Sequence, residues 1–416
     1  MPRSILLIVG MAALAACGGS GSDAPVAATT RDSAGVTIME YPADAFEKAP
    51  LWELSQQPLT VIGGDPDDTE LDLSTSQLGA LLSDNRIAVV TFKPAQLLLF
   101  SEDGATRTQI GHEGEGPGEY RLIARLEALA ADTLAVYEAV ARRELRYLPD
   151  GTVAGSVQFP FGDLLIPAIP LGHLADGTYL FQTMNPLAKP PVGADKYYRL
   201  ASPILAWREG QEAMDTLFQV PGALSVQSTV SVGTESATIS RPLAYASQSF
   251  TVPTGERIWT TPGDRFVLDA RDASGALVAS VRMARPARTV TSADQEAYKA
   301  KLREGLERVR AMGIAPPGLI ESEIKKIDET DFAPQMPAIG LLSIDRVGRL
   351  WVTAGTAGVD SVLTYAVFSS TGELLGRVVL PSGLLMGANA DRVVVRREDE
   401  GSGLVRFEVW GLTKTQ

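Results

Sequence analysis

Three observations predict that the sequence folds as an all-β protein, a six-bladed β-propeller with an N-terminal strand closing the last blade and a small helical insertion. A short turn followed by a β-rich run occurs six times. A second turn that carries glycine follows each copy, and the last copy leaves too few residues for an outer strand of its own. Since single all-β domains can be long, the 416 residues require no second globular domain.

The first element is a predicted signal peptide, residues 1–16. Arg3 supplies a positive start, and residues 5–9 begin an apolar run that is too short to span a bilayer as a helix. The run ends in Leu14-Ala15-Ala16-Cys17, which resembles the lipobox of bacterial lipoproteins. That resemblance implies cleavage before Cys17 and lipid attachment to its thiol. The alternative is an ordinary cleaved signal peptide that happens to contain a cysteine.

Residues 17–35 are expected to form a flexible, lipidated tether. Its first part is rich in Gly and Ser, and Cys17 is the only cysteine, so it has no partner for an intramolecular disulfide. Gly18 stands where lipoproteins retained in the inner membrane are associated with aspartate. The resemblance therefore implies a chain in the cell envelope, lipid-anchored to the outer membrane and facing the periplasm or the cell surface.

The propeller is expected over residues 36–416. Each unit starts with a turn of Asp, Asn or Gly before a β-rich run, a pattern typical of hairpins. Four antiparallel strands per unit, repeated at roughly 45 residues, are typical of propeller blades. The six copies begin at Asp84, Asp132, Asp176, Gly255, Gly348 and Asp391.

A second turn is predicted between the third and fourth strands of each blade. Only Leu412 to Gln416 follow the last of these turns, which is too little for a fourth strand. Residues 58–63 resemble the outer-strand run 108–111, so we expect residues 58–62 to pair with residues 404–410 and complete the sixth blade. The six predicted turns are Asp103-Gly104, Asp150-Gly151, Glu209-Gly210, Ser274-Gly275, Thr371-Gly372 and Trp410-Gly411.

Two stretches, residues 31–38 (RDSAGVTI) and residues 110–120 (IGHEGEGPGEY), resemble a family of bacterial six-bladed propeller lipoproteins. These are similar to NHL-type and TolB-type propellers. The resemblance extends over nearly the whole chain after Cys17, and it implies the fold. It implies no particular activity.

Extra residues at about 184–201, 220–242 and 289–337 map to one face of the propeller, together with residues 112–121. The insertion 289–337 is predicted to be helical in part. Its apolar residues recur at helical spacing from Tyr298 to Met312, with a start near Ser292 and a second short helix through Ile320 and Ile324. It would cap the channel mouth or dock a partner, or it would merely cover the ends of blades four and five.

The stretch at residues 112–121 is the candidate ligand-binding region. Its carboxylates would suit Ca²⁺, a cation that prefers oxygen ligands, but the sequence favours a tight inter-blade turn, which explains its glycines and proline more directly. We expect no other cofactor and no metal ligands elsewhere. The candidate residues are His112, Glu113, Glu115, Glu119, Tyr120 and Arg121.

The other histidine, His173, precedes the turn of the third blade on a strand expected to line the central channel. A histidine there would serve as a general base or fill a structural role. No nucleophile elbow, HExxH helix or Cys-His cluster occurs in the sequence.

These features favour a non-enzymatic binding or scaffolding module of the cell envelope. Its partners would be the membrane, through the lipid anchor, and an envelope protein, a peptide or a glycan. The net charge of −13 and the lack of a basic stripe exclude nucleic acid as an expected partner. The alternative is a divalent-metal-dependent hydrolase or lyase of the gluconolactonase type, for which the sequence offers no assignable ligand set.

Overall fold

A computed structural model describes residues 26–68, 71–161, 168–183, 189–190, 192, 195–232, 235–311, 317–355, 362–399 and 402–414. The predicted signal peptide and Cys17 lie outside the described residues, so their lipidation stays a prediction. No described helix is long and apolar enough to cross a membrane.

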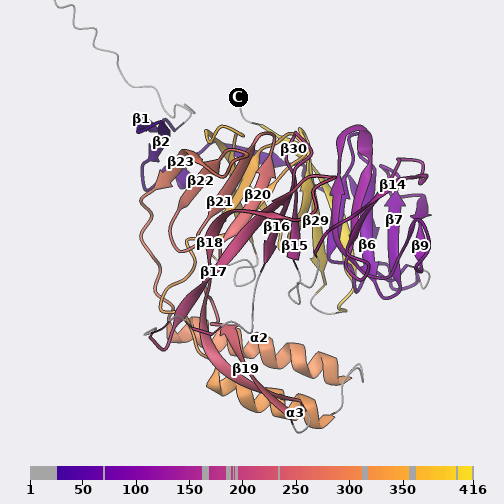
Figure 1. Ribbon diagram of the computed structural model, residues 1–416. Helices are drawn as coiled ribbons and strands as arrows, with labels where there is room; N and C mark the ends of the chain where they lie inside the picture. The colour runs from indigo at the N-terminus through magenta and orange to yellow at the C-terminus, as the bar shows by residue number, and fades with distance from the viewer. Residues whose placement is uncertain are drawn as a thin grey trace, which may run out of the picture.

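The described residues form a six-bladed β-propeller, as predicted (Figure 1). Each blade is an antiparallel sheet whose first strand lies innermost. The first blade consists of β5 (Leu78–Leu81), β6 (Ile87–Phe92), β7 (Ala95–Phe100) and β8 (Arg107–Ile110), and the second of β11 (Ile123–Ala128), β12 (Leu134–Glu138), β13 (Arg143–Tyr147) and β14 (Val153–Gln158). The third blade consists of β15 (Ala168–His173), β16 (Tyr179–Thr183), β17 (Tyr198–Trp207) and β18 (Asp215–Val232), and the fourth of β20 (Phe250–Thr254), β21 (Arg257–Thr261), β22 (Val267–Arg271) and β23 (Leu277–Met283). The fifth blade consists of β24 (Ile339–Ile344), β25 (Leu350–Ala354), β26 (Leu363–Phe368) and β27 (Leu374–Leu380), and the sixth of β28 (Leu384–Ala388), β29 (Arg392–Glu398), β30 (Val405–Thr413) and β4 (Thr60–Gly63).

Local turn chemistry fixes the hairpins of the blades. Each of the six repeat copies leads into the second strand of its blade. In the turn between β7 and β8, Gly104 has a φ of +72°, a backbone conformation that glycine adopts without strain. The carboxylate of Asp103 accepts a hydrogen bond from the Ala105 amide at 3.0 Å. The turn at Asp150-Gly151 repeats this arrangement.

The N-terminal strand closes the ring as the sequence predicts. Strand β4 pairs antiparallel with β30, with Ile62 opposite Phe407 and Thr60 opposite Val409. Ile62 is buried among apolar side chains of the first and sixth blades. The first and last parts of the chain therefore complete one blade together.

The turn predicted at Trp410-Gly411 is wrong. Gly411 lies within β30, opposite Arg392, and exchanges hydrogen bonds with Ser55 instead of reversing the chain. A turn is unnecessary there because β3 (Leu51–Leu54) and β4 pair with β30. The N-terminal segments thus supply these partners of β30.

Three further strands near the N-terminus wrap the outside of the propeller. Strand β2 (Val36–Tyr41) pairs in parallel with β23, and β1 (Thr29–Ser33) lies outside it. Helix α1 (Ala45–Lys48) leads to β3 (Leu51–Leu54), which lies between β27 and β30. The last part of the range 17–35, expected to be a flexible tether, thus forms a strand, because its residues hydrogen-bond to β2 around a turn at Ala34-Gly35.

Apolar side chains fill the spaces between blades. One cluster joins the fourth and fifth blades through Trp259, Val352 and Phe368, and Phe46 of α1 packs onto it. Burial of side chains of this size stabilises the fold by about 1.5–3 kcal/mol each. This interlocking makes each blade depend on its neighbours.

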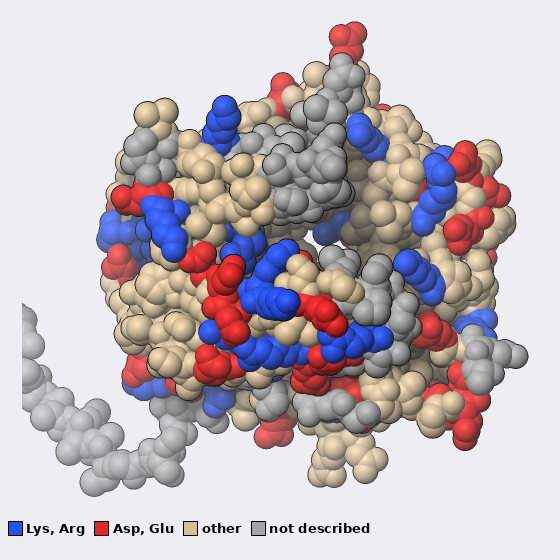
Figure 2. Space-filling model, turned by 90° about the horizontal axis from the view of Figure 1, so that it is seen from below, with Lys and Arg blue, Asp and Glu red and all other residues tan. Residues whose placement is uncertain are grey.

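The helical insertion forms as predicted. Helix α2 (Ser292–Ala311) begins after Thr291, whose hydroxyl accepts a hydrogen bond from the Asp294 amide while the Asp294 carboxylate accepts one from the Thr291 amide. Helix α3 (Pro317–Lys326) and the 3-10 turn η2 (Ile327–Glu329) follow. Figure 2 shows basic and acidic side chains gathered over this face of the molecule, with a hollow near its centre.

The insertion is attached to a hairpin that extends from the third blade. Strand β18 continues beyond the blade and pairs with β19 (Glu235–Pro242). Tyr245, Tyr298 and Phe332 pack edge to face between this region and the helices. The helices and β19 lie together on one side of the propeller (Figure 1). Two predicted insertions therefore meet on one face and brace one another.

Candidate functional site

A cavity of about 330 Å³ lies in the central channel. The innermost strands of all six blades contribute to its wall, near the ends at which they turn into the second strands. Its lining residues are Gly79, Ala80, Leu81, Arg125, Leu126, Glu127, Ala128, His173, Pro253, Thr254, Gly255, Ile344, Asp345, Arg346, Gly348, Met386, Gly387 and Ala388. A volume of this size suits a small ligand.

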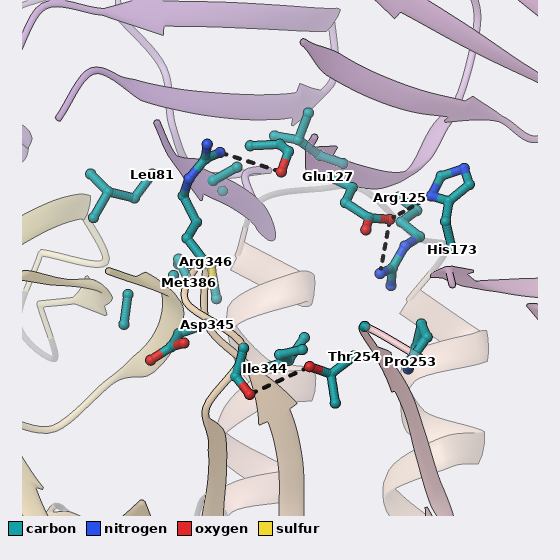
Figure 3. Close-up of a pocket in the computed structure, with 18 residues that line it drawn as sticks. Leu81, Arg125, Glu127, His173, Pro253, Thr254, Ile344, Asp345, Arg346 and Met386 are labelled. Atoms are coloured by element: carbon teal, nitrogen blue, oxygen red, sulfur yellow. Dashed lines mark hydrogen bonds and ion pairs between the residues drawn. The ribbon is translucent and has the colours of Figure 1, made fainter. Parts of the chain in front are cut away.

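Charged side chains gather on the part of this wall between the second and third blades (Figure 3). Arg125 and Glu127 are two residues apart on β11, so both point to the same face of their strand. Their charged ends are 3.4 Å apart. His173, the last residue of β15, faces them from the third blade.

Gly172 makes room for this cluster. Its φ is +122°, and a Cβ atom there would lie 3.0 Å from Arg125 Nη2 and 3.1 Å from Glu127 Oε2. A side chain at this position would push the two charged groups away. The glycine before His173 is thus part of the site.

His173 lies between two carboxylates. Its Nδ1 is 3.5 Å from Glu127 Oε2, and its Nε2 is 3.0 Å from Glu144 Oε2. Neither ring nitrogen has a hydrogen-bond partner among the described residues, and both contacts are ion pairs when the ring is protonated. Burial favours the neutral ring, but Glu127 and Glu144 outweigh burial and raise the pKa of His173 to about 9. The imidazole is therefore a cation at neutral pH.

Both carboxylates remain ionised in spite of burial. Burial opposes ionisation of Glu127, but Arg125 and His173 lower its pKa below the ordinary value. The pKa of Glu144 is likewise lowered, because His173 and Arg146 outweigh its burial. The cluster is a network of fixed charges at neutral pH.

The network extends from the channel into the space between the second and third blades. A second, small cavity there shares Arg125, Glu127 and His173 with the channel cavity. At its inner end Glu144 Oε1 accepts hydrogen bonds from Arg146 Nε at 2.8 Å and from the Tyr179 hydroxyl at 3.1 Å. The site is therefore continuous from the channel to the core of the blade interface.

Arg346 reaches across the ring from the fifth blade to the second. Its guanidinium donates to Asp132 Oδ1 at 2.7 Å and to the Ala128 carbonyl at 3.3 Å. Asp132 also accepts hydrogen bonds from the Ser83 amide and hydroxyl. Since the fifth and second blades lie opposite one another, this ion pair spans the channel at the end away from the insertion.

Hydrogen bonds join neighbouring blades at this same end. They tie the first turn of one blade to the next and hold the cavity wall in place. The backbone amides of Ala175 and Arg346 donate to the carbonyls of Gly255 and Ala388. The Thr254 hydroxyl donates to the Gly348 carbonyl, and the side-chain amide of Asn389 donates to the side-chain oxygen of Asn85.

The stretch at residues 112–121 forms an inter-blade turn away from the cavity. Strands β9 (His112–Glu113) and β10 (Glu119–Tyr120) pair side by side. Glu119 accepts a hydrogen bond from the Gly116 amide at 2.7 Å and lies 3.5 Å from His112. Glu115 pairs with Arg121 at 2.7 Å. These charges satisfy one another within the turn.

Tyr120 does not belong to an exposed binding face, which corrects the prediction for that residue. Its side chain is fully buried, and its hydroxyl donates to the Ile110 carbonyl and accepts from the Leu97 amide, each at 2.8 Å. Burial raises its pKa to about 12. Tyr120 anchors the turn to the first blade.

No arrangement suited to a metal ion occurs in the described part of the chain. The described residues contain no group of three or more His, Cys, Asp or Glu side chains placed to hold one. Glu113, Glu115 and Glu119 do not form such a group. Binding of Ca²⁺ at this turn stays a prediction that the donor geometry does not favour.

Sequence reasoning placed His173 at the channel but missed its partners. Arg125 and Glu127 stand in the run Ile123-Ala124-Arg125-Leu126-Glu127, where charged residues alternate along an innermost strand. Charge on a strand that faces an enclosed channel is the signal that would have found them. Arg346 carries no such signal, because its partner comes from the opposite blade.

Comparisons with known proteins agree with the architecture. Residues 69–185 match the family described as 6-bladed beta-propeller. No curated protein sequence matches the chain.

Among solved structures, a Bacteroides fragilis protein described as exported has 13% identity and a TM-score of 0.44, over 91% of this chain and 100% of its own. A gluconolactonase from Xanthomonas campestris has 15% identity and a TM-score of 0.38, over 82% and 86%. A virginiamycin B lyase from Staphylococcus aureus has 10% identity and a TM-score of 0.37, over 87% and 100%. Similarity at this level transfers no function.

Proposed function

We propose that the protein is a non-enzymatic binding module that holds a small ligand in its central channel. The observation that carries this proposal is the cavity of about 330 Å³, to which all six blades contribute and into which charged side chains project from fixed positions. Ligand pockets combine such a preformed hollow with a few polar groups that orient the ligand.

The charges at the cavity suit recognition better than proton transfer. A general base must be unprotonated at the working pH, and the best bases have a pKa near it. His173, with a pKa of about 9, is protonated at neutral pH and lies between two carboxylates. It therefore orients Glu127 and Glu144 and holds the second and third blades together.

We further propose that the module belongs to the cell envelope and is anchored by lipid at Cys17. The support comes from residues 1–17, which combine a positive start, a short apolar run and a lipobox-like ending. Mass spectrometry of the N-terminal peptide tests this proposal. An acylated Cys17 is expected, and a Cys17→Ser variant should leave the membrane fraction.

Ligand binding in the channel is tested with a variant that fills the cavity. Met386 is half-buried on the cavity wall, so Met386→Trp should occupy the space that a ligand needs. Val379, which is 37% exposed on the outer strand of the fifth blade, provides a control as Val379→Trp.

Both variants and the wild-type chain are screened for thermal shifts with a panel of small metabolites. Compounds that stabilise the wild-type chain should also stabilise Val379→Trp but not Met386→Trp. Binding that survives in Met386→Trp places the ligand elsewhere and overturns the proposal. A panel that shifts neither the wild-type chain nor the control does the same.

A further inference from the structure

We infer that the channel cavity recognises a small monocarboxylate, whose anionic group binds Arg125 and whose apolar part lies against Ile344 and Met386. This inference rests on the proposed binding function and specifies its ligand. It is carried by an imbalance of charge at the cavity, by unused donor capacity on Arg125 and by the distribution of apolar side chains.

Cations outnumber carboxylates where the second and third blades meet. Among the described residues of the network, Arg125, Arg146 and His173 share only Glu127 and Glu144. The remaining charges of the cavity wall are already balanced, since Arg346 pairs with Asp132 and Asp345 pairs with Arg349. The site therefore carries a surplus of one positive charge.

The surplus lies on Arg125. Glu144 is engaged by Arg146 and His173, and Glu127 lies between His173 and Arg125. The contact between Arg125 Nη2 and Glu127 Oε2 is 3.4 Å, which is long for a hydrogen bond. The side chain of Arg125 lines the cavity and is 33% exposed, although its Nε is buried and has no hydrogen-bond partner among the residues that the structure describes. The guanidinium thus has donors to offer a ligand.

A guanidinium with free donors matches the geometry of a carboxylate. Its N–H groups form a planar fork that binds two oxygens at once, and such charge-assisted bonds are the stronger ones. One surplus charge is neutralised by one carboxylate. A phosphate dianion would leave the site negative in a partly buried place, which is unfavourable.

The opposite part of the cavity carries apolar side chains next to Arg346 and Asp345, whose charges are already paired. Figure 3 shows Arg125, Glu127 and His173 on one side and Leu81 and Met386 on the other. Ile344 and Met386 are half-buried and line the cavity. A ligand with a charged end and an apolar body would therefore bury both ends against matching surfaces.

The test uses hexanoate as the probe and hexanamide as its uncharged counterpart, with inorganic phosphate as a third probe. Binding to the full chain is measured by isothermal titration calorimetry at neutral pH. Hexanoate should bind, whereas hexanamide and phosphate should bind at least tenfold more weakly. Equal binding of acid and amide, or tighter binding of phosphate, overturns the inference.

Two variants of the site should change affinity in opposite directions. Arg125→Gln removes the surplus charge and should weaken hexanoate binding at least tenfold. Glu127→Gln removes a competing carboxylate and should tighten it. Arg265→Gln, at an exposed arginine between β21 and β22, is the control and should leave affinity unchanged. If Arg125→Gln binds hexanoate as Arg265→Gln does, the inference fails.

The result also separates this inference from the proposed function. If an uncharged probe binds the wild-type chain and is lost in Met386→Trp, the channel is a ligand site and only the carboxylate preference is wrong. If no probe of any charge distinguishes Met386→Trp from Val379→Trp, the channel binding function itself is wrong.

Discussion

The protonation of His173 provides the sharpest test of the site. The network around it raises its pKa from the ordinary 6.5 to about 9. A difference of this size corresponds to about 3 kcal/mol of stabilisation of the protonated ring in the folded chain. Only 13% of the side chain is exposed, so solvent weakens the interaction little.

The sign of the pH dependence follows from the raised pKa. Below about pH 6.5 the ring is protonated in both the folded and the unfolded chain, and the stabilisation is complete. It is lost as the pH rises through 9. The lowered pKa values of Glu127 and Glu144 act at the acidic end, where their stabilisation is lost as the pH falls below their ordinary value of 4.5.

The assay is an NMR titration of the wild-type chain labelled with ¹³C-histidine. Only two histidines are present, so a His112→Gln variant identifies the signal of His173. Its midpoint is expected near pH 9. Urea unfolding at pH 6.5 and pH 9.5 should also show a loss of about 3 kcal/mol in the wild-type chain that His173→Gln does not show. A midpoint at or below 6.5 would refute the reasoning about the network.

Three other substitutions test the fold. Ile62→Ala should lower the free energy of unfolding by about 3 kcal/mol, since it leaves a cavity where β4 closes the ring, whereas Val61→Ala on the exposed side of β4 should cost much less. Arg346→Ala should lower the free energy of unfolding by about 3 kcal/mol, because it leaves Asp132 buried without its cation. If the two residues act as a pair, the double variant Arg346→Ala/Asp132→Asn should lose less stability than Arg346→Ala alone. Thr291→Ala should cost about 1 kcal/mol and speed amide exchange in the first turn of α2; unchanged exchange there would contradict the capping role.

The blades could be predicted from sequence because their signals are local. The turn at Asp103-Gly104 specifies its hairpin through its own residues, and such turns recur along the chain. Helix α2 was predicted for the same reason, from its apolar spacing and its start near Ser292. The strand at residues 58–62 was found because the last blade lacked one.

Pairings between distant segments could not be predicted in this way. Strand β2 pairs in parallel with β23, and the residues of β2 give no indication of which strand is the partner. Gly411 resembles the glycines of the other turns but lies in a strand, because its partner comes from the N-terminal segment.

The candidate site shows the same division. The turn at residues 112–121 was the candidate ligand-binding region because of its carboxylates. In the structure, the Glu119 carboxylate accepts a hydrogen bond from the Gly116 amide of the same turn. Arg125 and Arg346 acquire their significance only from blades that meet them in space.

The external strands also govern when the molecule can become complete. Strands β2, β3 and β4 precede β5, the first strand of the first blade, yet their partners β23, β27 and β30 come late in the chain. Contacts between segments so far apart in sequence slow folding, since a long loop must close before they form. The pairing of β4 with β30 therefore cannot form until the last strand is present, and the sixth blade is incomplete before then.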